Sequence, residues 1–214
     1  MKPAKYEPLY NFSVILDATI AETKKNGKQS SNDMVWMSGE ECMGIEVTDE
    51  DKPSQSNLVI FDFKNQSMVT VIQNDEGDQA MAMPMITQED MDYSQIAEEY
   101  SEDYSFSKSG RTKNILGYNC EEYIFDSEDV DGNVWVTTEA GISTMEMFED
   151  MYQGNKDSFK DSNYMNWFGE GLMMESESKD EKGNVTTYRV TKIQEDARFT
   201  VEMEEYEMIG PMGR

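Results

Sequence analysis

Apolar and polar residues alternate along much of this chain, which predicts β-strands. Between positions 10 and 20 the apolar residues fall on even positions: Tyr10, Phe12, Val14, Leu16, Ala18 and Ile20. A period of two over this length indicates one strand with a single buried face. Two other segments, 58–63 and 68–72, are largely continuous apolar runs. Such runs indicate strands that are covered on both faces or are central in a sheet.

Residues that tolerate positive φ separate the strand-like runs. An Asn-Gly pair at 26–27 and a Gly-Asn pair within 182–184 each lie between two such runs. The last section of the chain adds three strands, at 172–178, 186–193 and 198–206. Because sequence neighbours usually pair in space, we predict a meander of about ten antiparallel strands.

The clearest hairpin surrounds Trp135. A strand at 117–126 is followed by an acidic, Gly- and Asn-containing turn at 129–133 and by a second strand at 133–139. Strand-forming residues on both sides of such a turn predict antiparallel pairing of the two strands.

Two segments have helical character. The acidic stretch at 86–103 is predicted to connect two halves of the sheet, with a short helix beginning at Thr87. Ser143 and Glu146 have the spacing of a capping box. The apolar positions that follow recur at helical spacing: Met145, Phe148 and Met151. We therefore predict an amphipathic helix within 143–153, with its apolar face buried against the sheet, because a helix this short is marginal alone.

The charge of the chain excludes several partners. It has 44 acidic residues against 18 basic residues and no His, which gives a net charge of −26. Such a charge repels phosphate backbones and anionic lipid surfaces, so we predict no binding to nucleic acid or to a simple membrane surface. No apolar run of about 20 residues occurs, so no transmembrane segment is predicted.

The two cysteines, Cys42 and Cys120, are far apart in the sequence. A disulfide between them would close a long loop and stabilise the fold by about 4 kcal/mol in the chain-entropy model. Cys120 lies in a strand-like run, which favours free, buried thiols instead.

The residue types argue against catalysis. Without His there is no Ser-His or Cys-His pair and no imidazole base. No Gly-rich phosphate loop or nucleophile elbow is present. A pair of carboxylates of the glycosidase type is permitted, but so many acids make any such pair uninformative. We predict that the protein is not an enzyme and uses no cofactor.

The sequence contains two candidate metal sites. Asp129, Asp131 and Asn133 have the spacing of a calcium loop, but Val134 stands where an EF-hand needs Gly and Ala140 stands where it needs Glu. We therefore predict no tight Ca²⁺ site at 129–133.

The chain also has 18 Met, with an M-x-M-x-M run formed by Met81, Met83 and Met85. On a strand these three thioethers would share one face, and thioethers are soft ligands that suit Cu(I). The alternative is that Met fills an adaptable apolar interior. We favour the interior because Met recurs all along the chain.

The hairpin also carries a family resemblance. The order G-Y-x-C-x-x-Y from Gly117, a short acidic gap, and V-W-V-T-x-x-x-G-I from Val134 resemble a family of small secreted bacterial proteins, the domain of unknown function 4412. The resemblance implies a fold similar to the periplasmic lipoprotein carriers of the LolA/LolB type. In these carriers a curved antiparallel sheet half-closes over an apolar cavity that helices plug.

The sequence therefore predicts a mainly β protein, a curved antiparallel half-barrel with two or three short helices on its concave side, as a single LolA-like domain over residues 1–214. The resemblance implies a non-catalytic binding or carrier protein of the cell envelope that holds a lipid or acyl ligand. Candidate cavity residues are Trp135, Met145, Phe148, Met151 and Met83.

Two alternatives to the carrier stay open. One is a Met-rich Cu(I)-binding protein, and the other is a structural or interaction module with a solid core. The short, charged, Pro-containing start is typical of a mature chain after removal of a signal peptide, so we expect a periplasmic or secreted protein.

Overall fold

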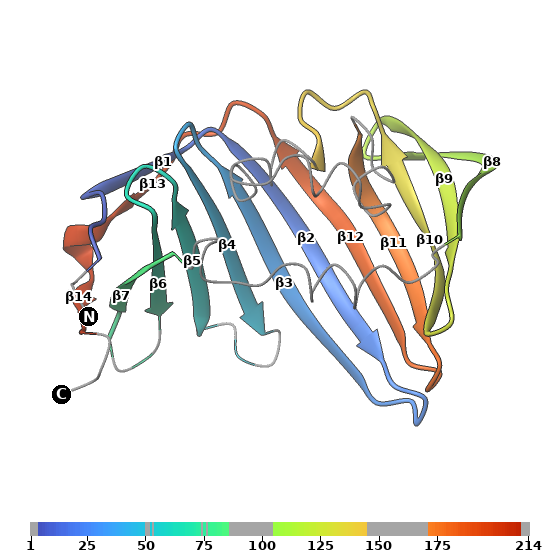
Figure 1. Cartoon of the computed structure of the whole chain (residues 1–214), viewed down its shortest axis with the longest axis horizontal. Coiled ribbons are helices and arrows are strands. Elements are labelled where there is room, and N and C mark those ends of the chain that lie inside the picture. The colour runs from blue at the N-terminus through green and yellow to red at the C-terminus, as the bar shows by residue number, and fades with distance from the viewer. Residues whose placement is uncertain are drawn as a thin grey trace. The chain divides into compact units, whose positions relative to one another are not determined.

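A computed structural model describes residues 4–49, 52, 54–73, 75, 77–85, 105–144 and 171–210 (Figure 1). These residues are mainly β-strand, as the alternation predicts. They belong to two compact units. The first unit comprises residues 1–18, 31–85 and 191–214, and the second unit comprises 19–30 and 86–190. The single domain expected over 1–214 stays a prediction.

The strands of the first unit belong to two sheets. In the smaller sheet β1 (Leu9–Phe12) pairs antiparallel with β13 (Phe199–Glu202). In the larger sheet each strand from β3 to β7 pairs antiparallel with the next, and β14 joins β7 in parallel. The bounds of these strands are Gln29–Ser38 (β3), Cys42–Asp49 (β4), Ser56–Asp62 (β5), Ser67–Gln73 (β6), Gln79–Pro84 (β7) and Glu207–Met208 (β14).

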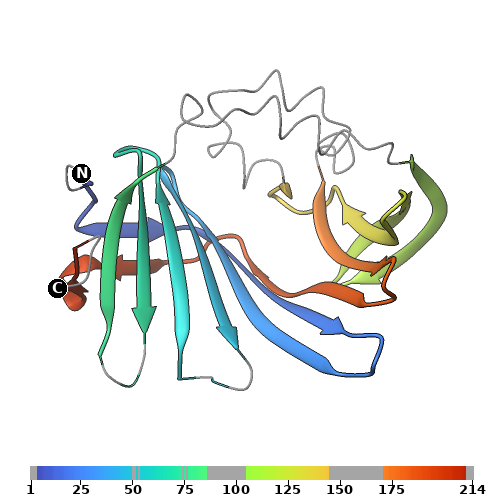
Figure 2. The ribbon, with the colours of Figure 1, turned by 60° about the horizontal axis from the view of Figure 1, so that its bottom comes forward.

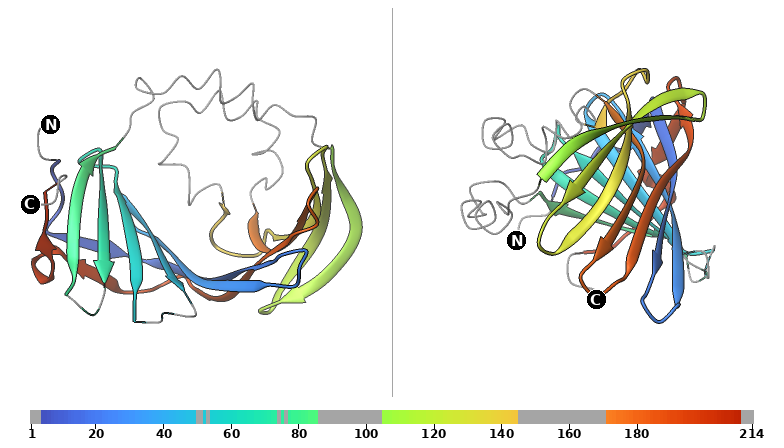
Figure 3. Two further views of the ribbon diagram at one scale, coloured as in Figure 1. Left: turned by 90° about the horizontal axis from the view of Figure 1, so that it is seen from below. Right: turned by 90° about the vertical axis from the view of Figure 1, so that its right-hand side faces the viewer.

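The strands of the second unit pair antiparallel in the order β8-β9-β10-β11-β12, with β8 at the edge (Figure 3). Their bounds are Ser105–Ile115 (β8), Tyr118–Asp126 (β9), Val130–Thr137 (β10), Leu172–Asp180 (β11) and Val185–Gln194 (β12). β2 (Val14–Thr23), β3 and β12 each contribute residues to both units.

The core of the first unit lies between the small sheet and one face of β3 to β7. Figure 2 shows β1 and β13 crossing behind the strands from β4 to β7. The central members of this core are fully buried, including Ile60, Val69 and Val71 at 0% exposure. The remaining buried members are Tyr10, Phe12, Ile15, Met37, Cys42, Leu58, Ala80, Val201 and Met203. The apolar runs at 58–63 and 68–72 thus form the inner strands β5 and β6, which confirms their prediction as central strands.

The single strand predicted from position 10 to position 20 is wrong in one respect. The chain breaks at Ser13, whose backbone N–H donates to the carbonyl of Ser38 at 2.9 Å. β1 therefore ends at Phe12 in the small sheet, and β2 begins at Val14 in the large sheet. Alternation along one strand carries no information about such a change of sheet, because Tyr10 and Phe12 are buried in either case.

The hairpin around Trp135 is confirmed, because β9 pairs antiparallel with β10. The turn predicted at 129–133 is misplaced: β10 already begins at Val130, and the Ser127 N–H donates to the Val130 carbonyl at 3.0 Å. Gly132 allows a close approach of β10 to the backbone of β11 and does not form a turn. A Cβ at this position would lie 2.2 Å from the Glu177 carbonyl oxygen and 2.6 Å from the Phe125 ring.

The two or three helices expected on the sheet are not found in the described residues. Those residues contain the 3-10 turn η3 at Met203–Glu205, which falls within the strand predicted at 198–206, and Thr144 is helical at the end of a described range. The predicted helices at 87–103 and 143–153 lie outside the described residues except at 143–144. In the part of the chain that the structure describes, no helix is long and apolar enough to cross a membrane.

Candidate functional site

The face of β3 to β7 that points away from the core of the first unit is also apolar. Side chains alternate along each strand, so Met37 and Ile60 point into the core while their sequence neighbours point the opposite way. The registers place the outward side chains in rows across the strands. One row is Trp36, Ile45, Val59, Thr70 and Met81, and another is Ser38, Met43, Phe61, Met68 and Met83. We call the apolar members of these two rows the Met-rich face.

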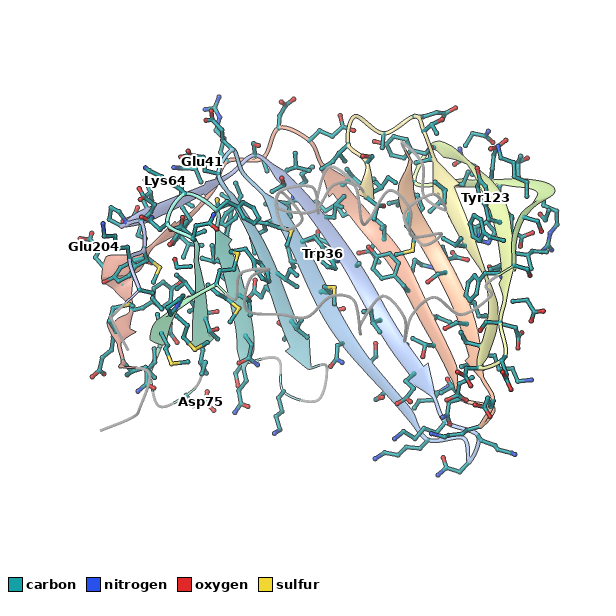
Figure 4. The ribbon with its side chains drawn as sticks, in the orientation of Figure 1. Trp36, Glu41, Lys64, Asp75, Tyr123 and Glu204 are labelled. Atoms are coloured by element: carbon teal, nitrogen blue, oxygen red, sulfur yellow. The ribbon has the colours of Figure 1, made fainter. Side chains whose placement is uncertain are left out.

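Exposure distinguishes this face from the core behind it. Met43 is buried, whereas the other seven apolar members are half-buried. Trp36 comes from β3, and sulfur atoms are visible along the neighbouring strands in Figure 4. None of the eight residues is charged, so the face offers an apolar surface whose contact with water is only partly removed. Such a surface can bind apolar ligands.

A row of different character runs through Trp135 in the second unit. Trp135 on β10 lies directly opposite Glu122 on β9 and Glu175 on β11, and Glu175 lies opposite Arg189 on β12. The Lys113 ammonium from β8 lies 4.1 Å from the centre of the Trp135 ring, a cation–π contact. Trp135 is 8% exposed, so these neighbours enclose it almost completely.

The two carboxylates of this row are neutralised by cations. Lys113 donates to one oxygen of Glu175, and the Arg189 Nε donates to the other at 3.1 Å. Glu122 is 1% exposed and accepts two hydrogen bonds from the Arg111 guanidinium and one from the Ser109 hydroxyl. Both carboxylates are therefore held in charge-assisted hydrogen bonds to cations.

The first unit also contains a groove of about 710 Å³ beside β1 and β13. Two of its lining residues are hydrogen-bonded to each other: the Tyr10 hydroxyl donates to Asp62 Oδ2 at 2.9 Å. The backbone N–H of Asn65 donates to Asp62 Oδ1 at 2.8 Å. At the rim Lys64 pairs with Glu7 at 3.1 Å and lies 4.0 Å from Glu41 (Figure 4). These bonds link β1 to the turn between β5 and β6.

The thiol in this groove is not activated. Burial raises the pKa of Cys42 to about 11, and the nearby Asp62 carboxylate adds to that effect. Burial also raises the pKa of the Tyr10 hydroxyl. Both groups therefore keep their protons at neutral pH, and a protonated thiol is a poor nucleophile. The expectation of free, buried thiols is confirmed, since Cys42 and Cys120 are both unpaired and buried.

The structure places the predicted site residues as follows. Met83 lies on the Met-rich face of the first unit, and Trp135 lies in the ionic row of the second. Met145, Phe148 and Met151 lie outside the described residues. Whether these residues line a ligand cavity stays a prediction, as does the absence of Ca²⁺ at 129–133.

Sequence reasoning did not select several residues that the structure brings together. Trp36, Phe61 and Met68 complete the Met-rich face, and Lys113 and Glu175 surround Trp135. The continuous apolar runs were the signal for the first group, because a strand that is apolar on both faces has a second face to cover. No local signal identified the second group, whose members are distant in sequence.

Comparison with protein families identifies the chain. The family model for the domain of unknown function DUF4412 matches residues 18–201. The chain belongs to this family. That confirms the family predicted from the residues of the β9–β10 hairpin. Among curated proteins none matches the sequence.

Solved structures include distant likenesses to this DUF4412 protein. The structure of PNGF-II shares 12% identity at a TM-score of 0.40, and the match covers 92% of this chain but only 31% of that one. A DUF1329 family protein from Desulfovibrio piger shares 10% identity at a TM-score of 0.34, covering 86% and 85% of the two chains. A LolA superfamily protein from Nitrosomonas europaea shares 10% identity at a TM-score of 0.31, covering 89% and 88%. Likeness of this degree assigns no function.

Proposed function

We propose that this DUF4412 protein is a non-catalytic binding or carrier protein of the cell envelope, which holds an apolar ligand of the lipid or acyl type on its Met-rich face. The observation that supports this proposal is the half-exposure of seven apolar side chains across five strands whose opposite face is a complete core. Core packing does not require these side chains, so their apolar character is available for a ligand.

The chemistry of the face suits acyl chains. Met is unbranched and flexible, so Met43, Met68, Met81 and Met83 can re-pack around chains of different length. Each buried CH₂ contributes about 0.8 kcal/mol, which gives useful affinity without a charged contact. Since no member of the face is charged, binding should depend little on salt concentration.

Two further observations support the remaining parts of the proposal. A non-catalytic role agrees with the absence of His from the sequence and with the raised pKa of Cys42. The envelope location follows from the resemblance of the β9–β10 hairpin to secreted bacterial proteins.

The test is titration of the full chain with a fluorescent fatty-acid probe. We expect saturable binding by the natural sequence and at least about tenfold weaker binding by Phe61→Asp, because a carboxylate on the face would have to be desolvated. Thr70→Asp, in the neighbouring row, serves if Phe61→Asp fails to fold. The matched control is Ile124→Asp in the second unit, where Ile124 is 42% exposed and the probe affinity should not change.

Two results would contradict the proposal. If the natural sequence shows no saturable binding, an interaction module with a solid core becomes the better description. If Ile124→Asp weakens binding as much as Phe61→Asp does, the probe is responding to overall charge and not to the Met-rich face.

A further inference from the structure

Three thioethers of the Met-rich face meet at strands β6 and β7. Met68 on β6 lies directly opposite Met83 on β7, and Met81 lies two residues before Met83 on the same face. Side chains directly opposite each other in an antiparallel pair have Cβ atoms about 5 Å apart, and diagonal neighbours about 7 Å. All three residues are half-buried, so their side chains extend over the sheet without being packed inside the core.

The strand register adds a residue to the M-x-M-x-M run that the sequence displays. Met85 follows Pro84, where β7 has ended, and its backbone N–H donates to the carbonyl of Gln66 at 2.9 Å, which continues the register of β6 with β7 by one position. Met85 therefore lies opposite Gln66, beyond the strand, and Met68 is the methionine that lies directly opposite Met83. Met68 stands 15 positions before Met83 in the sequence.

The surroundings of the three sulfurs favour a soft cation over a hard one. Among the described residues, the adjoining positions on β5 and β6 are Phe61, Val59 and Thr70, none of which is a carboxylate. On the other side of β7, Glu207 of β14 lies opposite Gln79, two residues before Met81. Calcium and magnesium need several charged or carbonyl oxygens, which this face does not provide. Neutral thioethers are soft ligands that bind Cu(I) without the loss of a proton.

We propose that Met68, Met81 and Met83 form a thioether site for a soft monovalent cation, Cu(I) or its stable analogue Ag(I). The Cβ separations let the three flexible side chains converge on one ion, and half-burial leaves a path for the ion to enter. The site goes beyond acyl binding, which needs only an apolar surface. A Leu at each position keeps a side chain of similar volume and apolar character and removes the sulfur.

The experiment is calorimetric titration of the full chain with silver nitrate in chloride-free buffer. Because the free thiols of Cys42 and Cys120 also bind soft metals, all proteins carry Cys42→Ala and Cys120→Ala. We expect one equivalent of Ag(I) bound by this parent, and at least about tenfold weaker binding after Met68→Leu/Met81→Leu/Met83→Leu. Circular dichroism should stay unchanged in the triple Leu variant.

Met173→Leu is the matched control. Met173 is also half-buried on a strand, but it lies opposite Val136 and not opposite another Met. Its substitution should leave Ag(I) affinity unchanged. If the cysteine-free parent does not fold, the same titration with both thiols present should show the triple Leu variant losing one equivalent.

Competition for Cu(I) against a chromophoric chelator under anaerobic conditions provides a second measurement. The variants should rank in the same order of affinity for Cu(I) as for Ag(I). Undiminished Ag(I) and Cu(I) binding by the triple Leu variant would overturn the proposal. Equal losses in Met173→Leu and the triple Leu variant would also overturn it, because metal binding would then be spread over the methionines of the chain.

Discussion

Trp36 in the first unit and Trp135 in the second both lie on antiparallel strands, but the residues beside them differ in chemical character. Trp36 lies in a row with Ile45, Val59 and Met81, whereas Trp135 lies between Glu122 and Glu175. The first row is apolar and half-buried, and the second consists of ion pairs that enclose the indole.

This difference shows how one backbone pattern supports two kinds of surface. Covering the Met-rich face with an apolar ligand removes apolar surface from water, which is favourable. A ligand at Trp135 would first have to break the contacts that Lys113, Arg189 and Arg111 make with the two carboxylates, and each broken contact leaves a charge to be resolvated. The ionic row is therefore expected to stabilise the second unit, and the Met-rich face to bind ligands.

The largest effect on stability is expected from Ile60→Ala in the apolar first unit. Ile60 is fully buried in the core of the first unit, so truncation removes transfer energy and leaves a cavity. We expect a loss of about 3 kcal/mol in the free energy of unfolding, measured with urea. Ile72→Ala on the neighbouring strand is the control, because Ile72 is 37% exposed and its truncation should cost less than about 1 kcal/mol. Similar losses in both variants would mean that the core is not where the structure places it.

The ionic side is tested by Arg111→Met. This substitution leaves Glu122, which is 1% exposed, without its guanidinium partner. Breaking a buried pair costs about 3–5 kcal/mol, but the Arg111 side chain is 65% exposed, so we expect about 2 kcal/mol by urea unfolding. Adding Glu122→Leu removes the unpaired charge and should restore part of that stability. A double variant that is no more stable than Arg111→Met would show that the ion pair is not the reason for the loss.

The sequence predicts where the strands of both units lie better than it predicts which distant residues they contact. Alternation and turn residues identified β9, β10 and the central strands β5 and β6, because these signals are local. The break at Ser13 was missed because it depends on a hydrogen bond to Ser38. The role of Gly132 was misread as a turn, because its constraint is the backbone of Glu177 on β11.

The candidate site shows the same limit. Met81 and Met83 could be assigned to one face from their spacing alone. Met68 joins them only through the register of β6 with β7, which depends on the length of the turn between these strands. The environment of Trp135 needs Glu175, a residue 40 positions later in the chain. Long-range register is the information that local periodicity does not contain.

A smaller effect is expected from Lys113→Met, which removes the cation above Trp135 and one partner of Glu175. Both side chains are partly exposed, at 32% for Lys113 and 21% for Glu175, so solvent screens the pair. We expect a loss of about 1 kcal/mol in unfolding free energy, together with altered tryptophan fluorescence. Lys108→Met is the control, because its pair with Glu121 is more exposed and should contribute less. A larger loss for Lys108→Met than for Lys113→Met would contradict the importance assigned to the row through Trp135.

The smallest effect concerns pH and the thiol of Cys42 in the first unit. Burial raises the pKa of this thiol from 9.0 to about 11. Above pH 9 the unfolded chain releases the thiol proton while the folded chain keeps it, so the folded state binds more protons and stability falls as pH rises. The contribution is fully present below pH 9 and is lost as pH rises through about 11. From neutral pH to pH 9 the loss should be less than about 1 kcal/mol, measured by urea unfolding at each pH.

Cys42→Ala should reduce the slope of the unfolding free energy against pH in this range, whatever its effect on absolute stability. An unchanged slope would mean that other groups titrate there, such as Tyr188 of the second unit, whose pKa burial raises to about 12.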